Sequence, residues 1–276
     1  IRAHAALRLE EHRNRALPLL EPAANAEEYY RRSEAHLTKF VEFLTSAGML
    51  PNENYTAPAL RAQIGEYAPP EQRGFFAQAS HREPMTMYAH AIHWVELARM
   101  RERPHQSPIR REAALYNIFD NRSEGLATAF EEMVMHTGLY DDNPRAREIV
   151  WIMLAQRAAR GLAALYAHAN EMTLTEARAF QAAWTPRGWM VSDPALAAWE
   201  QLFYLRQPGY GASYVTGKIQ FDALIAAYGR AAEARGERPE LGRLFTAIAD
   251  AGIIPVSMLL WEVTGNEHGG DPIASP

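Results

Sequence analysis

Residues 143–169 read NPRAREIVWIMLAQRAARGLAALYAHA. Asn143 is a residue type that caps helix N-termini with its side-chain oxygen. Pro144 follows it where the first helical turn tolerates the missing backbone N–H. We therefore expect a long helix that begins just after this cap and reaches about Ala169.

Similar helix boundaries recur along the chain, whereas alternating β-branched residues are rare. Asn25 precedes acidic residues, and Gly48 closes the same pattern. Thr173 and Glu176 form a capping-box pattern, and Asp193 precedes Pro194. The sequence predicts an all-α fold. The expected helices span about residues 26–47, 56–67, 84–102, 123–136, 145–169, 177–184, 194–207, 213–236, 239–252 and 255–264. The segment 50–80 is less regular, and a short strand or hairpin there stays open.

Composition excludes several functional classes. The 276 residues carry a net charge of −5, with acidic and basic residues interleaved, whereas nucleic-acid binding needs a clustered basic surface. There are no cysteines, which excludes disulfides, cysteine-ligated metals and cysteine nucleophiles. No apolar run approaches the roughly 18 residues that span a bilayer. We expect no nucleic-acid partner and no membrane span.

The domain organisation follows from the same pattern. We expect one helical domain over residues 1–264, and two packed lobes, 1–108 and 109–264, are an alternative. Residues 265–276 have little apolar content and are expected to form a loose tail. The chain starts with Ile1, so we expect a preceding or processed N-terminal part. A cytoplasmic location is favoured, a periplasmic or secreted one stays open, and a homodimer is compatible with the sequence.

Four short stretches carry a family resemblance. Residues 124–131 read EGLATAFE, 138–142 read GLYDD, 157–160 read RAAR, and 208–218 read PGYGASYVTGK. In this order and spacing they resemble the C-terminal half of the bacterial family known as domain of unknown function 885. That family is thought to belong with the helical zinc peptidases of the thermolysin-like (gluzincin) clan. The resemblance is good over residues 123–263 and weaker back to about residue 26.

The sequence departs from this family at its hallmark segment, H-E-x-x-P-G-H-H. Residues 87–94 read MYAHAIHW, without a Glu after a His and without the Pro-Gly pair. In zinc peptidases that Glu accepts the proton of the attacking water. Ordinary peptidase activity is therefore not expected.

Two histidines remain in the corresponding window. His90 and His93 are three residues apart, so on one helix their side chains share a face. The resemblance implies Glu124 as the third ligand of the metal. Two His and one carboxylate suit zinc or a non-haem iron, and manganese is a further alternative. Otherwise, both histidines are partly buried helix residues beside aromatic neighbours.

Other candidates come mainly from the resemblance. Glu131 is expected to orient a ligand or to replace the missing base, unless it is a solvated acid. Tyr214 is expected to donate to a developing oxyanion, unless it is a core tyrosine. His168 could share that role, or it could cap the end of its helix.

Arg157, Arg160 and Tyr210 are candidates for substrate binding. A guanidinium matches a substrate carboxylate, but arginines in long helices often pair with neighbouring acids instead.

The sequence thus predicts a diverged metallopeptidase-like protein, a metal-dependent hydrolase of a peptide-like, amide-like or amino-acid-derived small substrate. The alternative is a pseudoenzyme without metal, whose helical scaffold binds a partner. A missing N-terminal half or another subunit could also supply the groups that the chain lacks.

Overall fold

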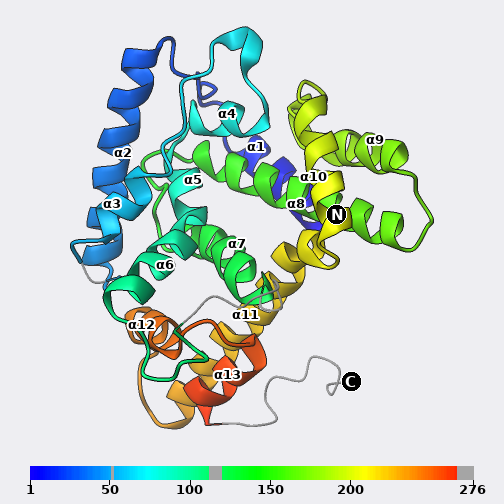
Figure 1. Ribbon diagram of the computed structural model, residues 1–276. Coiled ribbons are helices and arrows are strands. Elements are labelled where there is room, and N and C mark those ends of the chain that lie inside the picture. Colours follow the sequence, from blue (N-terminus) through cyan, green and yellow to red (C-terminus); the bar gives the residue numbers. More distant parts are fainter. Residues whose placement is uncertain (51–52, 112–119, 266–276) are drawn as a thin grey trace.

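The computed structural model describes residues 1–50, 53–111 and 120–265. Within these ranges every regular element is a helix, which confirms the all-α prediction (Figure 1). The α-helices are α1 Arg2–Arg13, α2 Ala26–Ser46, α3 Thr56–Arg61, α4 Phe75–Ser80, α5 Met85–His90, α6 Ile92–Glu102, α7 Asp120–His136, α8 Ala146–His168, α9 Leu174–Trp184, α10 Pro194–Arg206, α11 Tyr210–Ala234, α12 Leu241–Ala251 and α13 Val256–Thr264. Two 3₁₀-helices, η1 Pro70–Gln72 and η2 Pro186–Gly188, complete the described elements.

Helices α7 and α8 occupy the middle of the molecule (Figure 1). Helices α2 and α3 lie on one side of them, and α9 and α10 lie on the other. Helix α8 is the long helix expected after Pro144, and most of its residues from Ala146 to Ala164 are buried. A helix that is buried on nearly every side belongs in the centre of a large core.

Three of the expected caps are present, but the cap expected at Asn143 is not: α8 begins after Arg145 without a side-chain cap, and the Asn143 amide donates to Glu83 at 2.8 Å. Asn25 accepts the backbone N–H of Glu28 at 2.9 Å, which starts α2. Thr173 and Glu176 form a complete capping box at α9. The Asp193 carboxylate accepts the N–H of Leu196 at 3.1 Å at the start of α10, and its other oxygen accepts the N–H of Phe75 at 2.9 Å.

The segment between α2 and α5 differs from the prediction. The helix expected over 56–67 ends at Arg61, because the chain turns there and the Tyr67 hydroxyl donates to the Ala24 carbonyl at 3.1 Å. The strand or hairpin left open for 50–80 is not found among residues 53–80, which form α3, η1 and α4 instead. Helices α1 and α4 were not predicted.

The helix expected over 84–102 is divided at Ala91. Helix α5 ends at His90, and α6 begins at Ile92, with Ala91 at ψ 3° between them. The two histidines therefore lie on successive helices, and their approach does not follow from the three-residue spacing of one continuous helix.

Glycine pairs bring α11 against α7 and α8. A Cβ at Gly217 would lie 2.3 Å from the backbone oxygen of Asn121, and one at Gly125 would lie 2.5 Å from the Gly217 backbone. A Cβ at Gly161 would likewise lie 2.6 Å from the Gly211 backbone oxygen. These contacts leave no room for side chains, so the backbones approach closely. The first turns of α11, with Tyr210 and Tyr214, are thereby held against α7 and α8.

One apolar cluster contains residues from both expected lobes, including Phe40 of α2, Tyr88 of α5, Phe130 of α7 and Phe245 of α12. Of the expected C-terminal tail, residues 266–276 lie outside the described residues. Among the helices that the structure describes, none is long and apolar enough to cross a membrane.

Candidate metal centre

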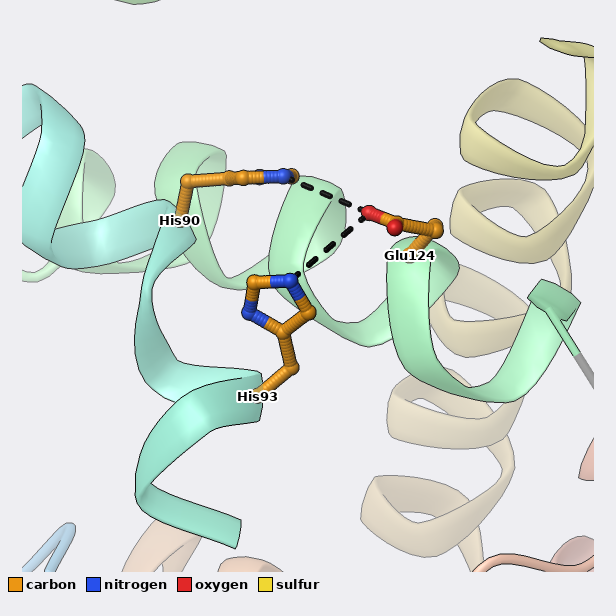
Figure 2. Close-up of side chains that lie close together, drawn as sticks. All are labelled: His90, His93 and Glu124. Carbon is orange, nitrogen blue, oxygen red and sulfur yellow. Dashed lines mark ion pairs between the residues drawn. The ribbon is translucent and has the colours of Figure 1, made fainter. Parts of the chain in front are cut away.

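His90, His93 and Glu124 come together where α5, α6 and α7 meet (Figure 2). The Nε2 atom of His90 lies 3.4 Å from Glu124 Oε2, and the Nε2 atom of His93 lies 4.0 Å from the same oxygen. One ligand atom from each residue lies within 4.8 Å of the other two. Figure 2 shows both imidazoles turned toward the carboxylate. The structure thus brings together the three residues that the sequence pointed to as ligands.

The Glu124 carboxylate has two different oxygens. Oε1 accepts a hydrogen bond from the Tyr210 hydroxyl. Oε2 is buried and has no hydrogen-bond partner in the described part of the chain, although it faces the two imidazoles. A buried carboxylate oxygen without a donor is costly unless a positive group completes it. This oxygen is therefore the strongest sign that the three residues could hold a cation.

The charge states of the group suit metal binding. Burial, the largest influence, raises the pKa of Glu124, but His90, His93 and Tyr210 outweigh it and lower the pKa to about 2. Burial and the neighbouring His90 lower the pKa of His93 to about 4. At neutral pH Glu124 is charged and His93 is neutral, which are the forms that bind metals.

His90 is supported from behind by an ion pair. Its Nδ1 atom lies 3.0 Å from Glu131 Oε1, and Arg157 donates to both oxygens of Glu131 at 2.5 and 2.7 Å. Burial raises the pKa of Glu131, but Arg157 and His90 outweigh it, so the pKa is lowered. A carboxylate on the second nitrogen of a metal-bound imidazole orients the ring and increases its basicity. Glu131 therefore fits the expected orienting role, and its engagement by Arg157 leaves it poorly placed as a free base.

The geometry fits a small divalent ion. Metal–ligand bonds of about 2.0–2.1 Å at tetrahedral angles place ligand atoms about 3.3–3.4 Å apart. The His90–Glu124 pair already has this spacing, whereas the His93–Glu124 pair at 4.0 Å has to close by roughly 0.6–0.7 Å. The side chains of His90 and His93 are 17% and 16% exposed, whereas the Nδ1 atoms of both histidines and Oε2 of Glu124 are buried. Three protein ligands leave one position of a tetrahedral ion for water or substrate.

Two tyrosines of α11 line the group. The ring of Tyr214 stacks on His90 at 6.0 Å between centroids, and Tyr214 is 8% exposed. Burial, the largest influence, raises the pKa of Tyr214 to about 12, so its hydroxyl keeps its proton at neutral pH. Burial and the charge of Glu124 also raise the pKa of Tyr210. Tyr210, expected at the substrate, instead contacts the ligand Glu124 directly.

The expected substrate-binding role of the two arginines is not supported. Arg157 is occupied by Glu131, and Arg160 pairs with Glu200 while its guanidinium lies over the Tyr214 ring, 4.2 Å from the centroid. Their side chains are 2% and 5% exposed, so neither guanidinium is open to a ligand. The alternative, ion pairs with neighbouring acids, describes both residues.

His168 does not belong to the group. It lies eleven residues after Arg157 on α8, roughly 16 Å further along the helix axis. Its Nε2 atom lies 3.0 Å from the carbonyl oxygen of Tyr204. The structure therefore does not bring His168 to the three ligands, and its position at the end of α8 matches the alternative.

Sequence reasoning missed Asp120. This residue begins α7 and lies four residues before Glu124, so the two carboxylates share a helix face. Burial, and to a lesser degree the charge of Glu124, raise the pKa of Asp120 to about 7. The four-residue spacing was the available signal, but an aspartate before an expected helix also suggests an ordinary cap.

Comparisons with known proteins add no relative. The chain matches no family model, no curated protein and no solved structure.

Proposed function

We propose that the chain binds one divalent metal ion, zinc in the first place, through His90, His93 and Glu124 and acts as a metal-dependent hydrolase. Its substrate would be a small amide-like, peptide-like or amino-acid-derived molecule. The observation that carries the proposal is the buried Glu124 Oε2, which lacks a hydrogen-bond donor in the described chain and faces two imidazole nitrogens. The resemblance to the helical zinc peptidases supports the reaction class.

The balance of charge around the group favours an electrophilic centre. Glu131 is neutralised by Arg157, and Glu200 is neutralised by Arg160. Glu124 is the only one of the three ligands with a negative charge, and His93 is neutral at pH 7. A divalent ion held by His90, His93 and Glu124 would keep a net positive charge, and it would supply the polarisation of a carbonyl and the acidification of water.

The chain's own residues would divide the remaining tasks. Glu131 and Arg157 fix the ring of His90, and Tyr210 fixes the carboxylate of Glu124. Tyr214, whose hydroxyl stays protonated, is the candidate donor to the negative charge that develops on the substrate oxygen. Because no Glu follows His90 or His93, the proton acceptor has to come from elsewhere.

Metal analysis of protein purified without chelators tests the first half of the proposal. We expect close to one zinc, iron or manganese per chain in the wild type and less than about a tenth in His93→Ala. His136→Ala is the matched control, because His136 is half exposed and pairs with Glu132 away from the centre. It should keep the wild-type metal content.

Activity tests the second half. Metal-loaded protein is assayed against a panel of dipeptides, acyl-amino acids and simple amides, with His93→Ala as the control. We expect hydrolysis of at least one class that is lost in the variant. Bound metal without any hydrolysis would contradict the second half of the proposal. Absence of metal from the wild type would contradict the proposal as a whole and would favour the metal-free pseudoenzyme.

A further inference from the structure

Asp120 lies beside the metal centre but has a different environment from its ligands. It precedes Glu124 by one helical turn on α7, so its carboxylate lies on the side of the helix that carries Glu124. Its carboxylate forms no hydrogen bond and no ion pair with any residue of the described chain. A half-buried carboxylate in this position remains available to another molecule.

Asp120 also borders a polar hollow of about 330 Å³. The same hollow is lined by Gly209 and Ser213, which lie on either side of Tyr210 at the start of α11. The same turn of α11 carries Tyr214, which stacks on His90. The hollow and the metal centre thus share the first turns of α7 and α11, and Asp120 lies at their border.

The other acids near the centre are occupied. Glu124 is the expected ligand through Oε2, and its Oε1 accepts from Tyr210. Glu131 accepts both donors of Arg157. Asp120 is therefore the remaining carboxylate of α7 on this side with no donor bound to it among the described residues. Burial and the charge of Glu124 raise its pKa to about 7, which suits a group that accepts and returns a proton near neutral pH.

We propose that Asp120 is the general base of the hydrolytic reaction, replacing the Glu that is missing after the histidine. The inference rests on the proposed function. An O–H bond of water breaks, its proton moves to the Asp120 carboxylate, and the water oxygen bonds to the substrate carbonyl carbon while the π electrons move to the carbonyl oxygen. When the C–N bond then breaks, Asp120 returns the proton to the leaving nitrogen. Water and amide become a carboxylic acid and an amine.

Asp120→Asn in the zinc-loaded protein is the direct test, because it removes the proton acceptor and keeps the size of the side chain. We expect kcat to fall about a hundredfold or more, the usual contribution of a general base. The dissociation constant for zinc, measured by competition with a chelator, should stay within about threefold of the wild-type value. Asp142→Asn, an exposed aspartate paired with Lys39, is the matched control and should leave both quantities unchanged.

Rescue by a small acid separates a base from a structural residue. Adding formate to Asp120→Ala should raise kcat at least about tenfold, because formate fits the vacated space and accepts the proton. Formate should have no effect on the wild type. A structural role of Asp120 would show no rescue and would overturn the inference.

The remaining outcomes are distinguishable. A large loss of zinc affinity in Asp120→Asn would make Asp120 a ligand, and an unchanged kcat would give it no role; either result overturns the inference and leaves the proposed function intact. A wild-type protein that binds zinc and hydrolyses nothing contradicts both.

Discussion

Glu124 and Glu200 are two buried carboxylates with opposite surroundings. Glu200, on α10, is 1% exposed and accepts from Arg160, Gln156 and Gln181. Glu124, on α7, is 6% exposed and accepts only from Tyr210, while its second oxygen faces two imidazoles. Burial alone therefore does not distinguish a structural acid from a ligand. The supply of donors does, because a complete set stabilises the fold and an incomplete set leaves room for a cation.

The largest expected effect tests the surroundings of Glu200, where the carboxylate has a complete set of donors. Glu200→Gln leaves the buried Arg160 without its counter-charge and brings amide donors against Gln156 and Gln181. Breaking one partner of a buried pair costs about 3–5 kcal/mol. We expect the free energy of unfolding in urea to fall by this amount, with zinc content unchanged in the folded protein. A loss of zinc without a loss of stability would show that Glu200 belongs to the metal centre and not to the fold alone.

His81 extends the comparison to imidazoles. Burial, and then the nearby Arg73, lower the pKa of His81 to about 4, and its Nε2 accepts the N–H of Ala68 at 3.0 Å. Between pH 6.5 and 4 the unfolded chain binds the proton and the folded chain does not, so stability rises with pH in this window. Its contribution is complete above about pH 6.5 and is lost by up to about 3 kcal/mol as the pH falls toward 4.

His81→Gln measures this contribution. The variant should show a flatter pH dependence of the unfolding free energy between pH 4 and 6.5 than the wild type, each measured without metal. No carboxylate of the described residues pairs with His81, whereas His93, with a similarly lowered pKa, faces Glu124. Identical pH profiles for the two proteins would contradict the assignment of His81.

Gly217→Ala disturbs the surroundings of Glu124 indirectly, by changing how α11 packs on α7. The added Cβ would lie 2.3 Å from the Asn121 backbone oxygen, so α11 must move away from α7. Overpacking of this kind costs about 1–3 kcal/mol of unfolding free energy. It should also weaken zinc binding, because Tyr210 moves with α11. Gly229→Ala, on the same helix with nothing within 4 Å of the new Cβ, should not destabilise the protein.

Tyr210→Phe gives the smallest expected effect. Losing the hydroxyl frees Glu124 Oε1, and outer-shell changes of this kind typically weaken metal binding about tenfold. Tyr228→Phe is the matched control on α11, because its hydroxyl donates to the Glu240 carbonyl at 3.1 Å. Equal zinc affinities in the two variants would remove Tyr210 from the centre.

The helices were largely predictable because their signals are local. Asn25, Thr173 and Asp193 act on backbone groups within their own first turns, and the structure contains each of these caps. The break at Ala91 was not predictable, because no proline or glycine marks it. The short helix α4 depends on an oxygen of Asp193, which is distant in the sequence.

The candidate site was predictable in its members but not in its contacts. His90, His93 and Glu124 were identified from residue types and the family resemblance. The pairing of Arg157 with Glu131, of Arg160 with Glu200 and of Tyr210 with Glu124 depends on how four helices pack. The glycines that bring α11 close enough were visible in the sequence, but the backbone that each one meets was not.

X-ray absorption spectroscopy of the zinc-loaded protein tests the central claim most directly. We predict a first shell with two imidazole nitrogens and one carboxylate oxygen at about 2.0–2.2 Å, completed by a light atom from solvent. In Glu124→Gln that shell should be lost together with most of the bound zinc. A wild-type spectrum without paired imidazole signals, or the same first shell in Glu124→Gln, would contradict the account.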